Sequence, residues 1–150
     1  MKYSYRITKY TNINENGDIY SDPDEWTSFF DIGQKVKKDE YERIENQYID
    51  YIINLCNCLG IKSLKIQALE VSVDEISYIE GESIDINQLK NGIKSILRED
   101  MWCKLISDTC EFHFGYDFYM YFVSKIDPKE CIDKINTLLT VQKYRSPYLD

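Results

Sequence analysis

Alternation of apolar and polar side chains predicts a sheet in the C-terminal half of the chain. The segment 101–124, MWCKLISDTCEFHFGYDFYMYFVS, places a large apolar side chain at nearly every second position, which is the period of strands with two different faces. Gly115 and Asp117 interrupt the run, because glycine tolerates a positive φ and aspartate can hydrogen-bond its own backbone in a turn. We expect a meander of three strands, at 101–107, 110–115 and 118–124.

The same two-residue period predicts three further strands. Residues 3–10, YSYRITKY, form the first strand near the start of the chain. Residues 64–73, LKIQALEVSV, form the second, and their alternation slips near Ala68, as a β-bulge would cause. A short last strand is expected at 141–144.

Three segments instead carry apolar residues at the spacing of an amphipathic helix, about 39–59, 86–98 and 128–139. Each starts with an aspartate followed three residues later by glutamate or glutamine, a capping-box pattern that satisfies free backbone N–H groups. The pairs are Asp39 with Glu42, Asp85 with Gln88, and Asp127 with Glu130. Pro128 suits the first turn of the third helix, and Gly60 suits the end of the first.

The predicted elements follow the order β, α, β, α, βββ, α, β. This order predicts a single α+β domain over 1–150, with three helices packed on a mainly antiparallel sheet. The chain of 150 residues is 43% hydrophobic and 29% charged, which is typical of a folded protein with its own core. No repeat, low-complexity tract or linker divides it.

The formal net charge of −8 restricts the classes of partner. Nucleic acids and anionic membranes are bound by clustered Lys and Arg, so we expect neither as a partner. An acidic surface suits a basic protein partner through electrostatic attraction, although it also serves solubility alone.

Acidic residues concentrate in two irregular segments that also contain aromatic residues. If the fold brings these segments together, they form a negative patch with aromatic anchors for a basic partner; otherwise they are solvated loops. The candidate partner-binding residues are Asp22, Asp24, Glu25, Trp26, Tyr78, Glu80, Glu82 and Asp85.

The cysteines show no spacing typical of a metal site. There is no C-x-x-C and only one histidine, so a zinc site lacks ligands, and we expect no metal. The N-terminus has no apolar signal region and no run approaches membrane-spanning length, so we expect a cytoplasmic, soluble protein with reduced, buried thiols. The five cysteines are Cys56, Cys58, Cys103, Cys110 and Cys131.

His113 is the one side chain with an ordinary pKa near neutrality. With Asp117 and Tyr119 it could line a pocket of a small enzyme or ligand-binding domain. No nucleophile motif, phosphate loop or dinucleotide fingerprint accompanies it, so we expect no cofactor and favour a non-enzymatic protein. The central meander is then a scaffold.

Several motifs resemble those of small bacterial immunity proteins from polymorphic and contact-dependent toxin systems. They are YRITKY, DEWTSFFDIG, WCKL with FHFGYDFYMY, and SPY near the end, and they cover about a third of the chain. The resemblance implies a protein that binds a cognate toxin domain and blocks its active site, and it implies no particular contact residues. A homodimer formed through a tyrosine-rich face is a further alternative.

Overall fold

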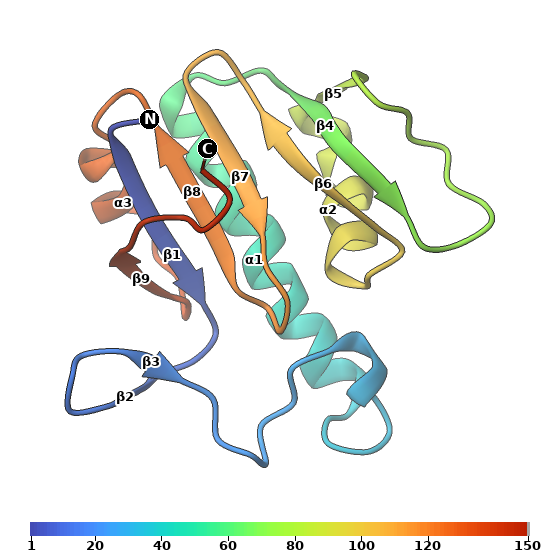
Figure 1. The fold of residues 1–150 in the computed structure, drawn as a ribbon, viewed down its shortest axis with the longest axis vertical. Helices are drawn as coiled ribbons and strands as arrows, with labels where there is room; N and C mark the ends of the chain where they lie inside the picture. Colours follow the sequence, from blue (N-terminus) through green and yellow to red (C-terminus); the bar gives the residue numbers. More distant parts are fainter. Residues whose placement is uncertain (150) are drawn as a thin grey trace.

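Seven strands form one antiparallel sheet in the computed structural model, which describes residues 1–149 (Figure 1). In spatial order they are β5 (Ser83–Asp85), β4 (Ser63–Val71), β6 (Met101–Ile106), β7 (Cys110–Phe114), β8 (Met120–Ser124), β1 (Tyr3–Thr8) and β9 (Thr140–Lys143). A separate hairpin pairs β2 (Asn12–Ile13) with β3 (Ile19–Tyr20). The predicted α+β class and the meander β6–β7–β8 are confirmed.

The helices lie on one face of the sheet, and the chain after β9 crosses the other face (Figure 1). They are α1 (Lys38–Leu59), α2 (Leu89–Leu97) and α3 (Lys129–Lys134), with short 3₁₀ turns η1 (Phe29–Asp31) and η2 (Ile86–Gln88). No helix within residues 1–149 has both the length and the apolar character needed to cross a membrane.

The core lies between α1, α2 and the helix-facing side of the meander. Phe112 and Phe122 are directly opposite on β7 and β8, with ring centroids 4.9 Å apart, and both are fully buried. The buried tyrosines of α1 are as deeply buried as its most buried aliphatic residues. The tyrosines are Tyr41, Tyr48 and Tyr51, and the aliphatic residues are Ile49, Ile52 and Leu55. The alternation in the sequence therefore identified the core face of the sheet.

The bulge expected near Ala68 is present in β4. The pairing of β4 with β6 shifts register between Gln67 and Glu70, and Ala68 has a φ of 59°. The Glu80 carboxylate accepts hydrogen bonds from the Ala68 and Leu69 N–H groups, at 3.0 and 2.7 Å. It thus satisfies two donors that the bulge removes from the ladder.

The predicted C-cap Gly60 is confirmed, but the predicted aspartates are not the N-caps of the three α-helices. Those N-caps are Lys37, Gln88 and Pro128, and none of them makes a side-chain capping bond; Asp127 accepts a hydrogen bond from the Lys129 N–H from the position before Pro128. Gly60 ends α1 in the left-handed region, and Asp85 accepts a hydrogen bond from the Asn87 N–H at the start of η2. Asp39 is not the cap of α1, because the Tyr41 N–H already bonds the Lys37 carbonyl, so the helix starts before Asp39.

The third helix is shorter than predicted and ends at Lys134 rather than near residue 139. Ile135 is extended, with φ −85° and ψ 118°. The chain must reach β1, where Thr140 pairs with Thr8, and an extended path covers that distance with fewer residues than a helix. The Gln47 side chain accepts a hydrogen bond from the Leu138 N–H along this path.

One disulfide corrects the expectation that all the thiols are reduced. It joins Cys58 in α1 to Cys131 in α3, with the Cα atoms 5.8 Å apart, a separation that a disulfide can bridge. The two cysteines are 73 residues apart in sequence, so their spacing does not indicate that they pair. The packing of α3 beside α1 brings them together. Cys56, Cys103 and Cys110 are buried free thiols, as predicted.

Replacing both linked cysteines with serine should lower the free energy of unfolding by about 4 kcal/mol, because the bridge closes a long loop in the unfolded chain. Guanidinium titration of the double variant measures this loss, and wild-type protein reduced with dithiothreitol serves as the matched control, expected to behave like the variant. Thiol titration of denatured, unreduced protein should find the three free cysteines; finding all five would contradict the bridge.

Candidate functional site

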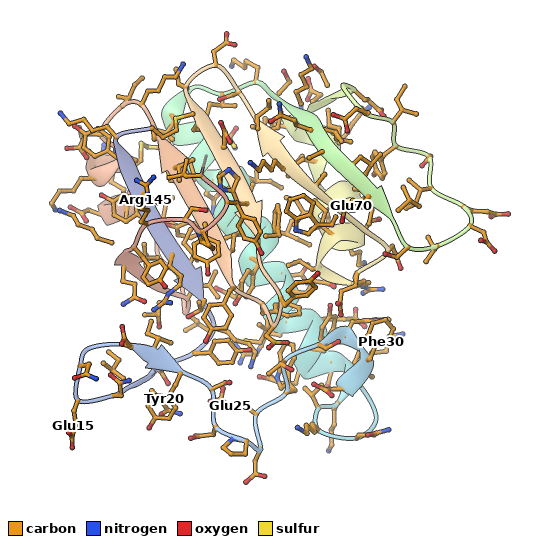
Figure 2. All side chains as sticks on the ribbon, in the orientation of Figure 1. Glu15, Tyr20, Glu25, Phe30, Glu70 and Arg145 are labelled. Carbon is orange, nitrogen blue, oxygen red and sulfur yellow. A yellow bond between two sulfur atoms is a disulfide. The ribbon has the colours of Figure 1, made fainter. Side chains whose placement is uncertain are left out.

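The two acidic segments proposed from the sequence lie at opposite edges of the sheet. Residues 18–25 include β3 and the loop that follows the hairpin after β1, whereas residues 74–85 run from the end of β4 through the edge strand β5 (Figure 1). In Figure 2, Glu25 lies on the lower loop, far from Glu70 on β4. The structure does not bring the two groups into one patch.

The first segment is held to the end of β1 by Lys9. The Lys9 Nζ lies 4.2 Å from the Trp26 ring centroid and 3.6 Å from a Glu25 carboxylate oxygen. Burial lowers the pKa of Lys9, and the Glu25 carboxylate opposes that shift. Trp26 is buried as a core anchor, Asp22 accepts a hydrogen bond from the Asn12 side chain, and Asp24 is exposed.

The acidic side chains of the second segment accept hydrogen bonds from backbone N–H groups of this chain. Glu80 accepts hydrogen bonds from backbone N–H groups at the bulge in β4. Glu82 accepts one from the Ile79 N–H, and Asp85 caps η2. Tyr78 packs half-buried against the core beside Gly92. These contacts give the segment a structural role that needs no partner.

His113 is fully buried beneath the C-terminal segment, residues 144–149. Its Nδ1 lies 2.8 Å from the Ser146 Oγ, and its Nε2 lies 2.8 Å from a Glu111 oxygen. The Tyr148 ring covers it with a centroid separation of 6.0 Å. His113 therefore does not share a pocket with Asp117 and Tyr119.

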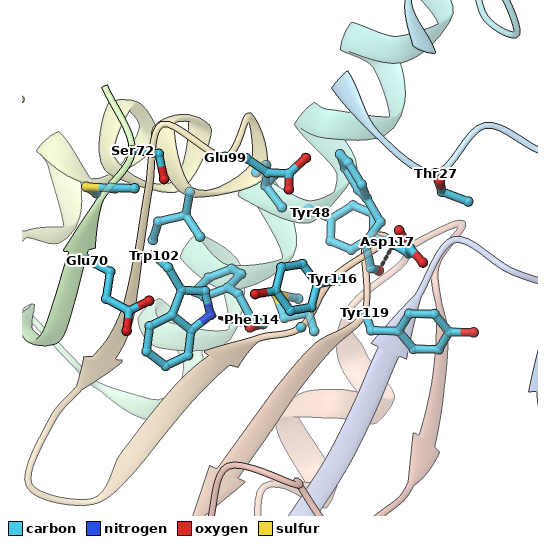
Figure 3. Close-up of a pocket in the computed structure, with 16 residues that line it drawn as sticks. Thr27, Tyr48, Glu70, Ser72, Glu99, Trp102, Phe114, Tyr116, Asp117 and Tyr119 are labelled. Carbon is cyan, nitrogen blue, oxygen red and sulfur yellow. Dashed lines mark hydrogen bonds between the residues drawn. The ribbon is translucent and has the colours of Figure 1, made fainter. Parts of the chain in front are cut away.

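Asp117 and Tyr119 instead line a cavity of about 130 Å³ at the end of the sheet where β4 and β7 finish and β6 and β8 begin (Figure 3). The last turn of α2 and the segment before η1 complete its wall. It is lined by Thr27, Tyr48, Glu70, Ser72, Ile96, Leu97, Glu99, Met101, Trp102, Phe114, Gly115, Tyr116, Asp117, Phe118, Tyr119 and Met120.

The turn between β7 and β8 forms one side of this cavity and has a strained backbone. Asp117 and Phe118 are in the left-handed region, with φ values of 60° and 66°. We expected Gly115 to adopt the positive φ of this turn, but it does not. Such a conformation costs non-glycine residues roughly 1–2 kcal/mol each. Gly115 is needed for space instead, because a Cβ there would lie 3.3 Å from the Tyr119 Cβ and carbonyl oxygen.

Two buried tyrosine hydroxyls hold the strained turn. The Tyr10 hydroxyl donates to the Asp117 carbonyl, and the Tyr48 hydroxyl donates to the Phe118 carbonyl at 2.7 Å. The Tyr48 oxygen also accepts a hydrogen bond from the Lys9 N–H at 2.7 Å. Burial raises the pKa of both phenols, so they remain protonated donors. Strain held in place this way is typical of binding and switch regions.

The ionisable side chains around the cavity are acidic or tyrosine. Glu70, Glu99 and Asp117 come from three separate elements, and no lysine, arginine or histidine is among the residues that line it. Glu99 accepts a hydrogen bond from the Ser28 hydroxyl. The preceding residue, Arg98, is tied to the buried Glu45 of α1 by contacts of 2.9 and 3.0 Å, which anchors this end of α2.

Aromatic side chains form the remaining walls of the cavity. The Trp102 indole N–H donates to the Phe114 carbonyl at 2.7 Å, and its ring packs against Tyr148 from the C-terminal segment. Figure 3 shows Tyr116 between Trp102 and Asp117, with Glu99 close by.

Sequence patterns did not identify Glu70, Glu99, Trp102 or Tyr116 as site residues. Glu70 and Trp102 become neighbours only through the pairing of β4 with β6, after the bulge has shifted the register. The turn at Gly115–Asp117 was the one visible signal.

Comparison of the chain with protein-family models, with curated proteins and with solved structures finds no match. The site therefore has to be interpreted from its own geometry.

Replacing Tyr48 with phenylalanine should lower the free energy of unfolding by about 3 kcal/mol, because it leaves the buried Lys9 N–H and Phe118 carbonyl without their partner. Tyr51→Phe is the matched control on the same helix. The Tyr51 hydroxyl is buried and has no hydrogen-bond partner within residues 1–149, so its removal should change stability by less than about 0.5 kcal/mol or increase it. Urea titration compares the two, and equal losses would show that the Tyr48 hydroxyl does not hold the turn.

Proposed function

We propose that this chain is an immunity-type binding protein that neutralises a basic bacterial toxin domain by covering its active site. The observation that carries the proposal is the acidic, aromatic cavity, together with the exposed apolar side chains next to it. The net charge of −8 and the sequence motifs described above agree with a basic protein partner.

Large apolar side chains are exposed around the cavity. Tyr116 is 78% exposed and lines it, and Val71 and Val73 flank the lining residue Ser72. Phe30, 68% exposed, lies two residues after Ser28, whose hydroxyl bonds Glu99. Exposed aromatic and apolar groups with polar groups around them are typical of protein interfaces.

The volume of the cavity favours a protein partner over a metabolite. Pockets for small molecules commonly measure roughly 300–1,000 Å³, whereas this cavity measures about 130 Å³. It fits a single side chain better than a whole ligand. His113, which the enzyme hypothesis required, lies outside it.

Co-expression tests this function directly. The chain should restore growth to bacteria that express the toxin-like domain encoded beside its gene, and the purified pair should form a one-to-one complex that weakens as salt is added. An absence of both growth recovery and complex formation would refute the proposal.

A Tyr116→Ala variant locates the interface. Because an exposed aromatic at the centre of an interface commonly contributes about 2 kcal/mol or more, its loss should weaken binding by roughly 30-fold. The matched control is Ile126→Ala, since Ile126 is also exposed but lies beyond the opposite end of β8. Titration calorimetry measures both variants, and equal affinities would place the interface elsewhere.

A further inference from the structure

We infer that the cavity between Trp102, Tyr116 and the turn at 115–119 receives one arginine side chain from a protein partner. This inference names the contact by which the proposed function would operate, so it rests on that proposal.

The shape of the cavity suits one long side chain. The cavity measures about 130 Å³ and opens at the ends of the strands. The rings of Trp102, Phe114 and Tyr116 form its sides (Figure 3). A planar guanidinium stacks on such rings and is attracted by their electron-rich faces. The apolar stem of an arginine would lie against Met101, Ile96 and Leu97.

The charge of the cavity favours a cationic group. Glu70, Asp117 and Glu99 present carboxylates from β4, the β7–β8 turn and the end of α2. Among residues 1–149, the Glu70 and Asp117 side chains have no hydrogen-bond or ion-pair partner, unlike Glu80 and Glu82, which bind backbone N–H groups. Figure 3 places Glu70 and Asp117 on opposite sides of the cavity, so a guanidinium that enters it can donate N–H groups to a carboxylate on either side.

The cavity is held in shape before any partner arrives. Tyr10 and Tyr48 fix the strained turn, and Trp102 is held by the Phe114 carbonyl on one side and Tyr148 on the other. A rigid receptor loses little conformational entropy on binding, so it favours one well-defined contact. The combination of rings, unpaired carboxylates and rigidity selects a guanidinium over the more strongly hydrated lysine ammonium.

The inference can be tested without the toxin. N-acetyl-arginine N-methylamide is titrated into the protein while the Trp102 indole N–H signal is followed by NMR, with the two tryptophan signals assigned by a Trp102→Phe variant. We expect a saturable shift with a dissociation constant on the order of millimolar. The uncharged citrulline analogue, which has nearly the same shape, should produce none; an equal response to it, or no response to arginine, would overturn the inference.

Charge-removing variants locate the site. Glu70→Gln with Asp117→Asn should weaken arginine binding at least about tenfold, and asparagine tolerates the positive φ at position 117. Asp108→Asn is the matched control, because Asp108 is exposed in the turn at the other end of β6. Asp108→Asn should leave arginine binding unchanged. A loss equal to that of the double variant would show that the effect comes from the net charge of the protein and not from the Glu70 and Asp117 carboxylates.

The same variants separate this inference from the proposed function. A chain that binds the arginine probe but no toxin domain would refute the proposed function alone. A chain that binds the toxin domain equally well with and without the Glu70 and Asp117 carboxylates would refute the arginine contact alone.

Discussion

The hydroxyl of Tyr48 joins the three parts of the molecule that meet at the cavity. From the middle of α1 it accepts the Lys9 N–H at the end of β1 and donates to the Phe118 carbonyl in the β7–β8 turn. Because all three groups are buried, losing the hydroxyl would leave two backbone groups unsatisfied. The strained turn, the packing of Phe118 against Trp26 and Tyr41, and the position of Asp117 all depend on this link.

Much of the acidic character of the chain is used inside the fold. Glu45 neutralises Arg98, Glu25 lies beside Lys9, and Glu80 serves the bulge in β4. Net charge alone therefore gives a poor guide to where a partner would be attracted. The Glu70 and Asp117 carboxylates are not used in this way: among residues 1–149 they have no side-chain partner, and both are exposed beside the aromatic walls of the cavity.

The central strands β7 and β8 are covered on both faces, whereas β4 exposes one face, and this explains the burial of His113 on β7. Helices cover one face, and the C-terminal segment covers the other through Tyr148, whose ring contacts Trp102, His113 and Tyr121. The alternation predicted strands with two different faces, and it left open what covers the second face. Here that face is buried by a segment of only a few residues, so His113 is a structural residue between β7 and the chain end.

Local periodicity was enough to predict the longer strands, the main helices, the bulge and the glycine that ends α1, because each depends on residues only a few positions apart. It missed the two- and three-residue strands β2, β3 and β5, which are too short to show a period. The meander of 101–124 and the core residue Phe112 follow directly from that alternation. The cavity, the disulfide and the burial of His113 could not be predicted in this way. Each depends on residues from distant segments that become neighbours only when strand order and helix packing are set. The pairs are Glu70 with Trp102, Cys58 with Cys131, and His113 with Ser146.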